Sequence, residues 1–204
     1  MSTRGAIGFY CKGKGKITYN HWDSYPSDLG INILEEIRDI PIEKLKEVFE
    51  QIKLIKDEQA KPTAEEFKQY SEYSDPSVGG SISNTKVKTY YQLLRKLQGT
   101  LKPYIEGKVK IMIDSESFLK DSLFCEWAYI INLDEEVLEV WKGFRKENSD
   151  NRYKWTIEEI KKELDEWKKR DINYKKEYYN CALIKKFPLN NLPTKEEFLK
   201  EVGD

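Results

Sequence analysis

The sequence predicts an α+β fold, in which a single domain carries a mainly antiparallel β-sheet covered by helices, plus an inserted helical segment. Strand-like stretches occur mostly in pairs separated by short turns, which is the pattern of hairpins. Helical patterns come in blocks rather than alternating with single strands, so a sheet of βαβ units is not expected. The 204 residues suit one domain, and no internal repeat divides them.

The N-terminal segment is predicted to form a hairpin. Residues 5–11 (GAIGFYC) and 16–20 (KITYN) are rich in apolar and aromatic residues, and the glycine-rich turn Lys12–Gly15 joins them. The stretch YNHWDSYPSDLG, residues 19–30, follows directly. Its proline and glycine predict a corner between the second strand and a helix.

Apolar residues at helical spacing predict a short helix after Gly30 and a second one from Ile42 to about Ile55. Three further helices begin with capping boxes. In a capping box a threonine side chain accepts a hydrogen bond from the third helical amide, and a glutamate side chain accepts one from the amide of that threonine. These boxes are Thr63–Glu66, Thr156–Glu159 and Thr194–Glu197. The helix after the second box carries one apolar stripe, made of Ile157, Ile160, Leu164 and Trp167.

The middle of the chain, residues 39–108, is predicted to be a helical elaboration within a single domain of residues 1–204. Residues 73–86 are rich in Ser, Gly, Asp and Pro and predict a mobile loop, with an ordered lid over a pocket as the alternative. Residues 87–97 (VKTYYQLLRKL) then predict a helix closed by Gly99.

The second half contains the strongest strand predictions. Residues 127–133 (WAYIINL) are almost continuously apolar, as expected of a central strand covered on both faces. Their hairpin partner is predicted at residues 137–144, after an acidic turn. Further strands are predicted at residues 108–114 and 178–187, so six strands are expected in total.

The composition indicates an aromatic core within a highly charged surface. Hydrophobic residues make up 39% of the chain and charged residues 35%, and the 13% of aromatic residues compensate because each ring buries a large area. Thirty-five basic residues nearly balance 36 acidic ones. Without a basic excess or stripe, nucleic acid is not expected as a partner, and the charges are expected to solvate helix faces.

Cysteine usage and hydropathy predict a cytoplasmic protein. Cys11, Cys125 and Cys181 are odd in number and widely spaced, so neither a disulfide framework nor a structural zinc site is expected. The apolar runs are too short to span a bilayer, and the N-terminus lacks a signal-peptide pattern, so no membrane is expected as a partner. No cofactor and no metal are predicted.

The only histidine of the chain lies in the predicted corner. His21 and Asp23 are two residues apart, so on an extended segment both side chains point to the same side, like a general base and its orienting carboxylate. Rings on which a base or sugar can stack are supplied by Tyr19, Trp22 and Tyr25.

A purely structural corner is the alternative. In that interpretation Pro26 fixes the bend, and Ser24 or Asp28 caps the following helix. His21 then only satisfies backbone carbonyls. This alternative explains the proline and the capping side chains, but it does not explain why an imidazole, carboxylates and rings gather in one short segment.

Arg4 lies on the first strand beside this corner, where its guanidinium can clamp a phosphate or a carboxylate through two hydrogen bonds. The alternative is that it pairs with a buried acid. Ser2 is a weaker candidate, since removal of Met1 would expose it as an N-terminal nucleophile. Glu126 and Asp114 end predicted strands, where acids either line a site or are solvated.

The segments STRGAIGF, YNHWDSYPSDLG, CEWAYIINLDEEVLEVWKGF and FPLNNLP together resemble a family of uncharacterised proteins from bacteriophages and other microbes, including fungi. The shared pattern is a Thr-Arg-Gly start, a Tyr-x-His-x-Asp-x-Tyr-Pro-x-x-x-Gly segment and a Glu-Trp-x-Tyr strand. It falls here on Thr3, Arg4, Gly5, Tyr19, His21, Asp23, Tyr25, Pro26, Gly30, Glu126, Trp127 and Tyr129. The resemblance implies that Arg4, His21 and Asp23 act together and, in a phage, that the protein sequesters a host immune signal.

The first functional hypothesis is binding of a small anionic ligand derived from a nucleotide. An arginine would meet the phosphate, the imidazole and carboxylate would bond the sugar or base, and the rings would stack. The residues predicted to bind this ligand are Arg4, Tyr19, His21, Trp22, Asp23 and Tyr25.

Two further hypotheses stay open. The protein is a hydrolase or phosphodiesterase, with His21 as catalytic general acid/base, Asp23 as its orienting partner and Arg4 stabilising negative charge. Alternatively, it is a protein-interaction module whose charged helices in residues 39–108 dock a host protein. A homo-oligomer is also compatible with the sequence.

Overall fold

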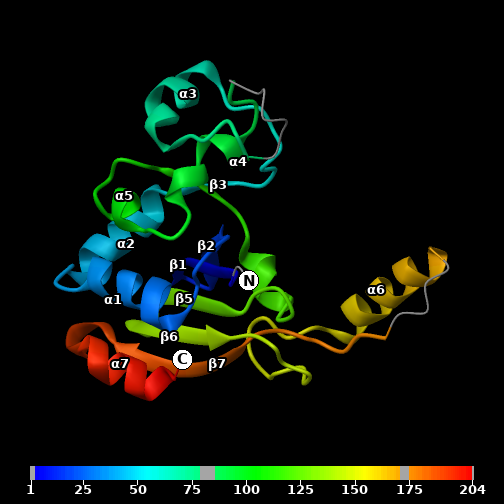
Figure 1. The fold of residues 1–204 in the computed structure, drawn as a ribbon. Coiled ribbons are helices and arrows are strands. Elements are labelled where there is room, and N and C mark those ends of the chain that lie inside the picture. Colours follow the sequence, from blue (N-terminus) through cyan, green and yellow to red (C-terminus); the bar gives the residue numbers. More distant parts are fainter. Residues whose placement is uncertain (1–2, 79–85, 171–174, 204) are drawn as a thin grey trace.

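The computed structural model of the protein describes residues 3–78, 86–170 and 175–203. These residues form one α+β domain around a five-stranded sheet of order β2-β1-β5-β6-β7 (Figure 1). Neighbouring strands are antiparallel except β1 and β5, which are parallel. A small second sheet pairs β3 with β4 in parallel. The strands are β1 Gly5–Cys11, β2 Lys14–Asn20, β3 Lys53–Ile55, β4 Ile111–Ile113, β5 Trp127–Asn132, β6 Val137–Lys142 and β7 Ala182–Pro188.

Seven α-helices accompany the sheet in the described part of the chain. None of them is long and apolar enough to cross a membrane. Their bounds are α1 Ile31–Ile37, α2 Ile42–Gln51, α3 Ala64–Tyr70, α4 Tyr90–Leu93, α5 Lys102–Ile105, α6 Ile157–Lys169 and α7 Lys195–Val202.

The two faces of the sheet are buried in different ways. Alternation along β1 directs Ile7 and Phe9 to one face, where they belong to one hydrophobic cluster with side chains of α1, α2, α5 and α7. The opposite face is covered by a 3-10 turn and irregular segments rather than α-helices, through Leu119, Tyr153 and Cys181. All six residues of β5 are buried, which confirms the predicted central strand covered on both sides.

The N-terminal hairpin turns more tightly than expected. Cys11 pairs directly with Lys14, so only Lys12 and Gly13 form the turn, with φ values of 53° and 71°. This left-handed pair is the geometry that matches the twist of a hairpin. Asp134, just after β5, accepts hydrogen bonds from both turn amides, at 2.7 Å and 3.2 Å, and so ties the hairpin to the central strand.

The three predicted capping boxes are confirmed at the starts of α3, α6 and α7. The apolar stripe of α6, however, is not buried in a core. No residue of α6 is buried, Ile157 is 81% exposed, and the helix extends away from the sheet (Figure 1). The helix α6 therefore belongs to the surface of the protein and not to its core.

The predicted second helix and the predicted strand at 108–114 are both too long. The helix ends at Gln51 because Lys53 donates its amide to the Lys110 carbonyl, at 2.8 Å, which starts β3. β4 covers only Ile111–Ile113, and it pairs with β3 in the small sheet instead of extending the main one. With β3 added, the described residues contain seven strands where six were expected.

Three other predicted boundaries are also wrong. The helix expected at 87–97 shortens to α4, followed by a 3-10 turn at Arg95–Leu97. The strand expected at 178–187 begins only at Ala182, because Tyr179 bonds to irregular backbone on either side of it. The hairpin partner expected at 137–144 stops at Lys142. Part of the predicted loop at 73–86, residues 79–85, lies outside the described residues.

Candidate functional site

The corner after β2 is anchored by Ser24, which is fully buried. Its amide donates to the Thr3 carbonyl at 3.2 Å, and its own carbonyl accepts from the Tyr129 hydroxyl at 3.1 Å. Asn20 donates its side-chain amide to the Ser24 hydroxyl at 2.8 Å. The corner is thus fixed to the segment before β1, to the end of β2 and to β5.

The predicted helix cap at this corner is wrong. Neither Ser24 nor Asp28 caps the next element; the chain instead makes one wide helical turn in which the Gly30 amide donates to the Tyr25 carbonyl at 3.1 Å. This turn leads directly into α1, so α1 begins without a side-chain cap.

Beside the corner lies a cavity of about 640 Å³, which we call the Arg4 cavity. Three of the six residues predicted to bind a ligand line it together, from the start of β1, the end of β2 and the corner. The remaining wall comes from the segment between β3 and α3, from α4, and from the residues in and around the 3-10 turn at Glu116–Lys120. The lining residues are Arg4, Tyr19, His21, Glu58, Tyr91, Asp114, Ser115, Ser117, Phe118 and Asp121.

Tyr19 and His21 form a hydrogen-bonded pair in this cavity, with 2.8 Å between the tyrosine hydroxyl and Nδ1. The pKa of His21 lies below its usual 6.5. Burial is the largest cause, followed by the charge of Arg95 and then by that of Arg4. Burial raises the pKa of Tyr19 above its usual 10.0. Both side chains are therefore neutral near pH 7, and the field around the imidazole is positive.

Arg95 is a charge near the site that sequence reasoning missed: it lowers the pKa of His21, although it does not line the Arg4 cavity. It is only 8% exposed, and its guanidinium lies 5.6 Å from the ring centroid of Trp22 and 5.5 Å from that of Tyr91. A cation at these distances is stabilised by the ring faces. An arginine among the leucines of QLLRKL, residues 92–97, is the signal that could have found it.

Arg4 is held at the mouth of the site by its backbone and by one ring. Its amide lies 3.4 Å from a Glu126 carboxylate oxygen, and its carbonyl accepts from the Glu126 amide at 3.0 Å. Its guanidinium lies 5.2 Å from the ring centroid of Phe124. The N-terminal candidate Ser2 lies outside the described residues.

The other three predicted site residues do not line the Arg4 cavity. Asp23 has a φ of 46°, so the segment is not extended there, and the expected same-side placement of His21 and Asp23 is wrong. Trp22 is 54% exposed and meets the His21 ring edge-to-face, 4.2 Å between centroids. Tyr25 is 43% exposed. Their roles toward a ligand stay predictions.

Three acidic residues, Glu58, Asp114 and Asp121, also line the cavity. Asp114 is ion-paired with Lys56. Burial raises the pKa of Asp121 above its usual 3.8, with the amides of Leu123 and Phe124 acting in the other direction. Paired or buried carboxylates of this kind are acceptors suited to hydroxyl groups of a bound sugar.

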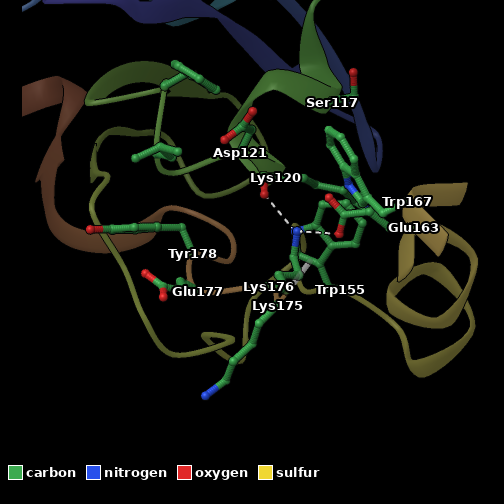
Figure 2. Close-up of a pocket in the computed structure, with 12 residues that line it drawn as sticks. Ser117, Lys120, Asp121, Trp155, Glu163, Trp167, Lys175, Lys176, Glu177 and Tyr178 are labelled. Carbon is green, nitrogen blue, oxygen red and sulfur yellow. Dashed lines mark hydrogen bonds and ion pairs between the residues drawn. The ribbon is translucent and has the colours of Figure 1, made fainter. Parts of the chain in front are cut away.

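A second hollow, of about 590 Å³, lies next to the Arg4 cavity; we call it the aromatic hollow (Figure 2). Ser117 and Asp121 line both it and the Arg4 cavity, so the two spaces meet at these residues. Its lining residues are Ser117, Lys120, Asp121, Leu123, Phe124, Trp155, Glu163, Trp167, Lys175, Lys176, Glu177 and Tyr178.

Comparison with known proteins adds no identification: no family model, no curated protein and no solved structure matches the chain. The resemblance to the phage and microbial family therefore stays a prediction that rests on its motifs. Within the described residues, no group of three or more His, Cys, Asp or Glu side chains could hold a metal ion.

Proposed function

We propose that the Arg4 cavity binds a small anionic ligand derived from a nucleotide. The observation that carries this proposal is that Arg4, the only lysine or arginine among the residues that line the cavity, shares it with the hydrogen-bonded Tyr19–His21 pair. After burial, the charges of Arg95 and Arg4 also lower the pKa of the imidazole. The guanidinium of Arg4 can donate two hydrogen bonds to a phosphate in this cavity. Arg95 is buried and does not line the cavity, and it adds positive charge nearby.

The cavity offers partners for the rest of such a ligand. Arg4 meets the phosphate, while the Tyr19–His21 pair and the carboxylates that line the cavity bond hydroxyl groups of the sugar. A protein that binds this ligand tightly and does not convert it would sequester a nucleotide signal. For a phage-encoded protein, which the sequence resemblance suggests, that signal would be one of host immunity.

Thermal shift and calorimetry with a panel of nucleotides and cyclic nucleotides test this proposal. We expect at least one member to stabilise the protein, and Arg4→Gln to weaken its binding by about tenfold or more, because a charge-assisted bond is lost. Lys44→Gln, at an exposed position of α2, also removes a positive charge; it is the control and should leave binding unchanged. A folded protein that no panel member stabilises would overturn the proposal.

The second candidate function is hydrolysis, and the lowered pKa of His21 favours it. A neutral imidazole near pH 7 is the form that a general base needs. In this alternative His21 activates water while Arg4 stabilises the developing negative charge. If the panel ligand is turned over, and His21→Ala abolishes turnover while binding persists, the protein is an enzyme; if no product forms, it only binds.

A further inference from the structure

The aromatic hollow has no role in the proposed function as stated above, although it adjoins the Arg4 cavity. Four of its lining residues carry aromatic rings, Phe124, Trp155, Trp167 and Tyr178, and a leucine, Leu123, adds apolar surface. Such a concave, ring-lined space next to an anion-attracting cavity is unusual for a surface that only contacts water.

The charges on the wall of this hollow are largely paired within the protein. Lys176, with only 6% of its side chain exposed, lies 3.6 Å from the Trp155 ring centroid and 2.7 Å from Glu163 (Figure 2). Lys120 is paired with Glu159 of α6. The indole of Trp155 also donates to the Lys120 carbonyl at 2.6 Å, so this ring is fixed in place.

The junction between the two spaces is built from Arg4 and Phe124. The guanidinium belongs to the wall of the Arg4 cavity, and the ring on which it lies belongs to the aromatic hollow. Ser117 and Asp121, which line both spaces, add a hydroxyl and a carboxylate at the same place. A ligand with its phosphate on Arg4 has rings directly beside it.

We propose that the aromatic hollow is the base subsite of the ligand, so that the ligand is a nucleotide whose phosphate lies on Arg4 and whose base lies among the rings. This inference rests on the proposed function and names the part of the site that contacts the base. Stacking on Trp167 and Tyr178 accepts any base, because every base has a π-face. Ser117 and Asp121 supply hydrogen bonds to the edge of the base.

Calorimetry with four mononucleotides, AMP, GMP, CMP and UMP, against ribose 5-phosphate tests the inference, because the last compound keeps the phosphate and sugar but lacks a base. We expect each mononucleotide to bind about tenfold or more tightly than ribose 5-phosphate. Trp167→Leu should remove that advantage and leave the affinity for ribose 5-phosphate within about twofold. Ile157→Ala, on the same helix but outside the hollow, should change neither.

The outcomes separate this inference from the proposed function. Equal affinities for mononucleotides and ribose 5-phosphate would overturn the base subsite and leave the anion site standing. A Trp167→Leu variant that weakens both kinds of ligand equally, with its helix content unchanged by circular dichroism, would also overturn the base subsite. Failure of all five compounds to bind would overturn the base subsite, whereas the anion site is overturned only if no member of the wider panel of nucleotides and cyclic nucleotides binds.

Discussion

The hydroxyl of Tyr19 lies 2.8 Å from Nδ1 of His21 and forms a hydrogen bond with it. This contact joins the end of β2 to the corner and places the only imidazole of the chain in the Arg4 cavity. Because no second histidine exists, the ring protons of His21 report directly on the charge around this cavity in a proton NMR spectrum.

The first prediction concerns the source of the positive field. Arg95→Gln should raise the pKa of His21 toward 6.5, because Arg95 is the larger of the two charges that lower it. Arg95→Lys keeps the charge and should change the pKa much less. The measurement is an NMR titration of the imidazole, and an unchanged pKa in the glutamine variant would show that the guanidinium does not act on His21.

The second prediction concerns stability against pH. The folded protein holds the pKa of His21 below 6.5, so the unfolded chain binds a proton more readily. The contribution of His21 to stability is therefore complete above pH 6.5 and is lost as pH falls through the lower pKa of the folded state. Urea unfolding between about pH 7.5 and about pH 5 should show a smaller loss of stability for His21→Gln than for the natural protein. Identical pH profiles would contradict this sign.

The third prediction concerns the anchor of the corner. Tyr129→Phe removes the donor to the Ser24 carbonyl in a fully buried place and should lower the free energy of unfolding by about 1 kcal/mol or more. Tyr25→Phe is the matched control, because Tyr25 is 43% exposed, and it should stay within about 0.5 kcal/mol. Chemical unfolding in urea measures both, and equal effects would show that the corner does not depend on this bond.

The fourth prediction compares two capping boxes. Thr194→Ala should lower the free energy of unfolding by about 1 kcal/mol, because α7 packs Phe198 and Val202 into the core. Thr156→Ala breaks the same motif at the start of α6, which buries no residue, and should fray that helix with a smaller effect on global unfolding. Hydrogen exchange resolves the two effects, and equal global losses would show that α6 is coupled to the core.

Local signals predicted local structure well. The three capping boxes and the burial of β5 depend on neighbouring residues and on runs of apolar side chains, and the structure has both as expected. The parallel pairing of β1 with β5 could not be predicted, because residues more than a hundred positions apart meet there. The three-residue strand β3 was hidden within an apparently continuous helical pattern.

In the candidate site, too, local placements could be predicted and placements that depend on tertiary packing could not. Tyr19 and His21 lie on one short segment, and their placement together follows from the corner; Arg4 joins them through the first strand. Arg95 comes from the elaboration in the middle of the chain, where only tertiary packing brings it near Trp22. The placement of Asp23 failed because one left-handed residue breaks the alternation of an extended segment.

The pKa of His21 in the absence and presence of AMP tests the central claim most directly. Without ligand, NMR titration should give a pKa below 6.5, because burial and two guanidinium groups disfavour the imidazolium ion. A phosphate bound on Arg4 brings negative charge near the ring, so saturating AMP should raise this pKa. A pKa of 6.5 or more in the free protein, or one that neither AMP nor any other nucleotide of the panel changes at high concentration, would contradict an anion site in the Arg4 cavity.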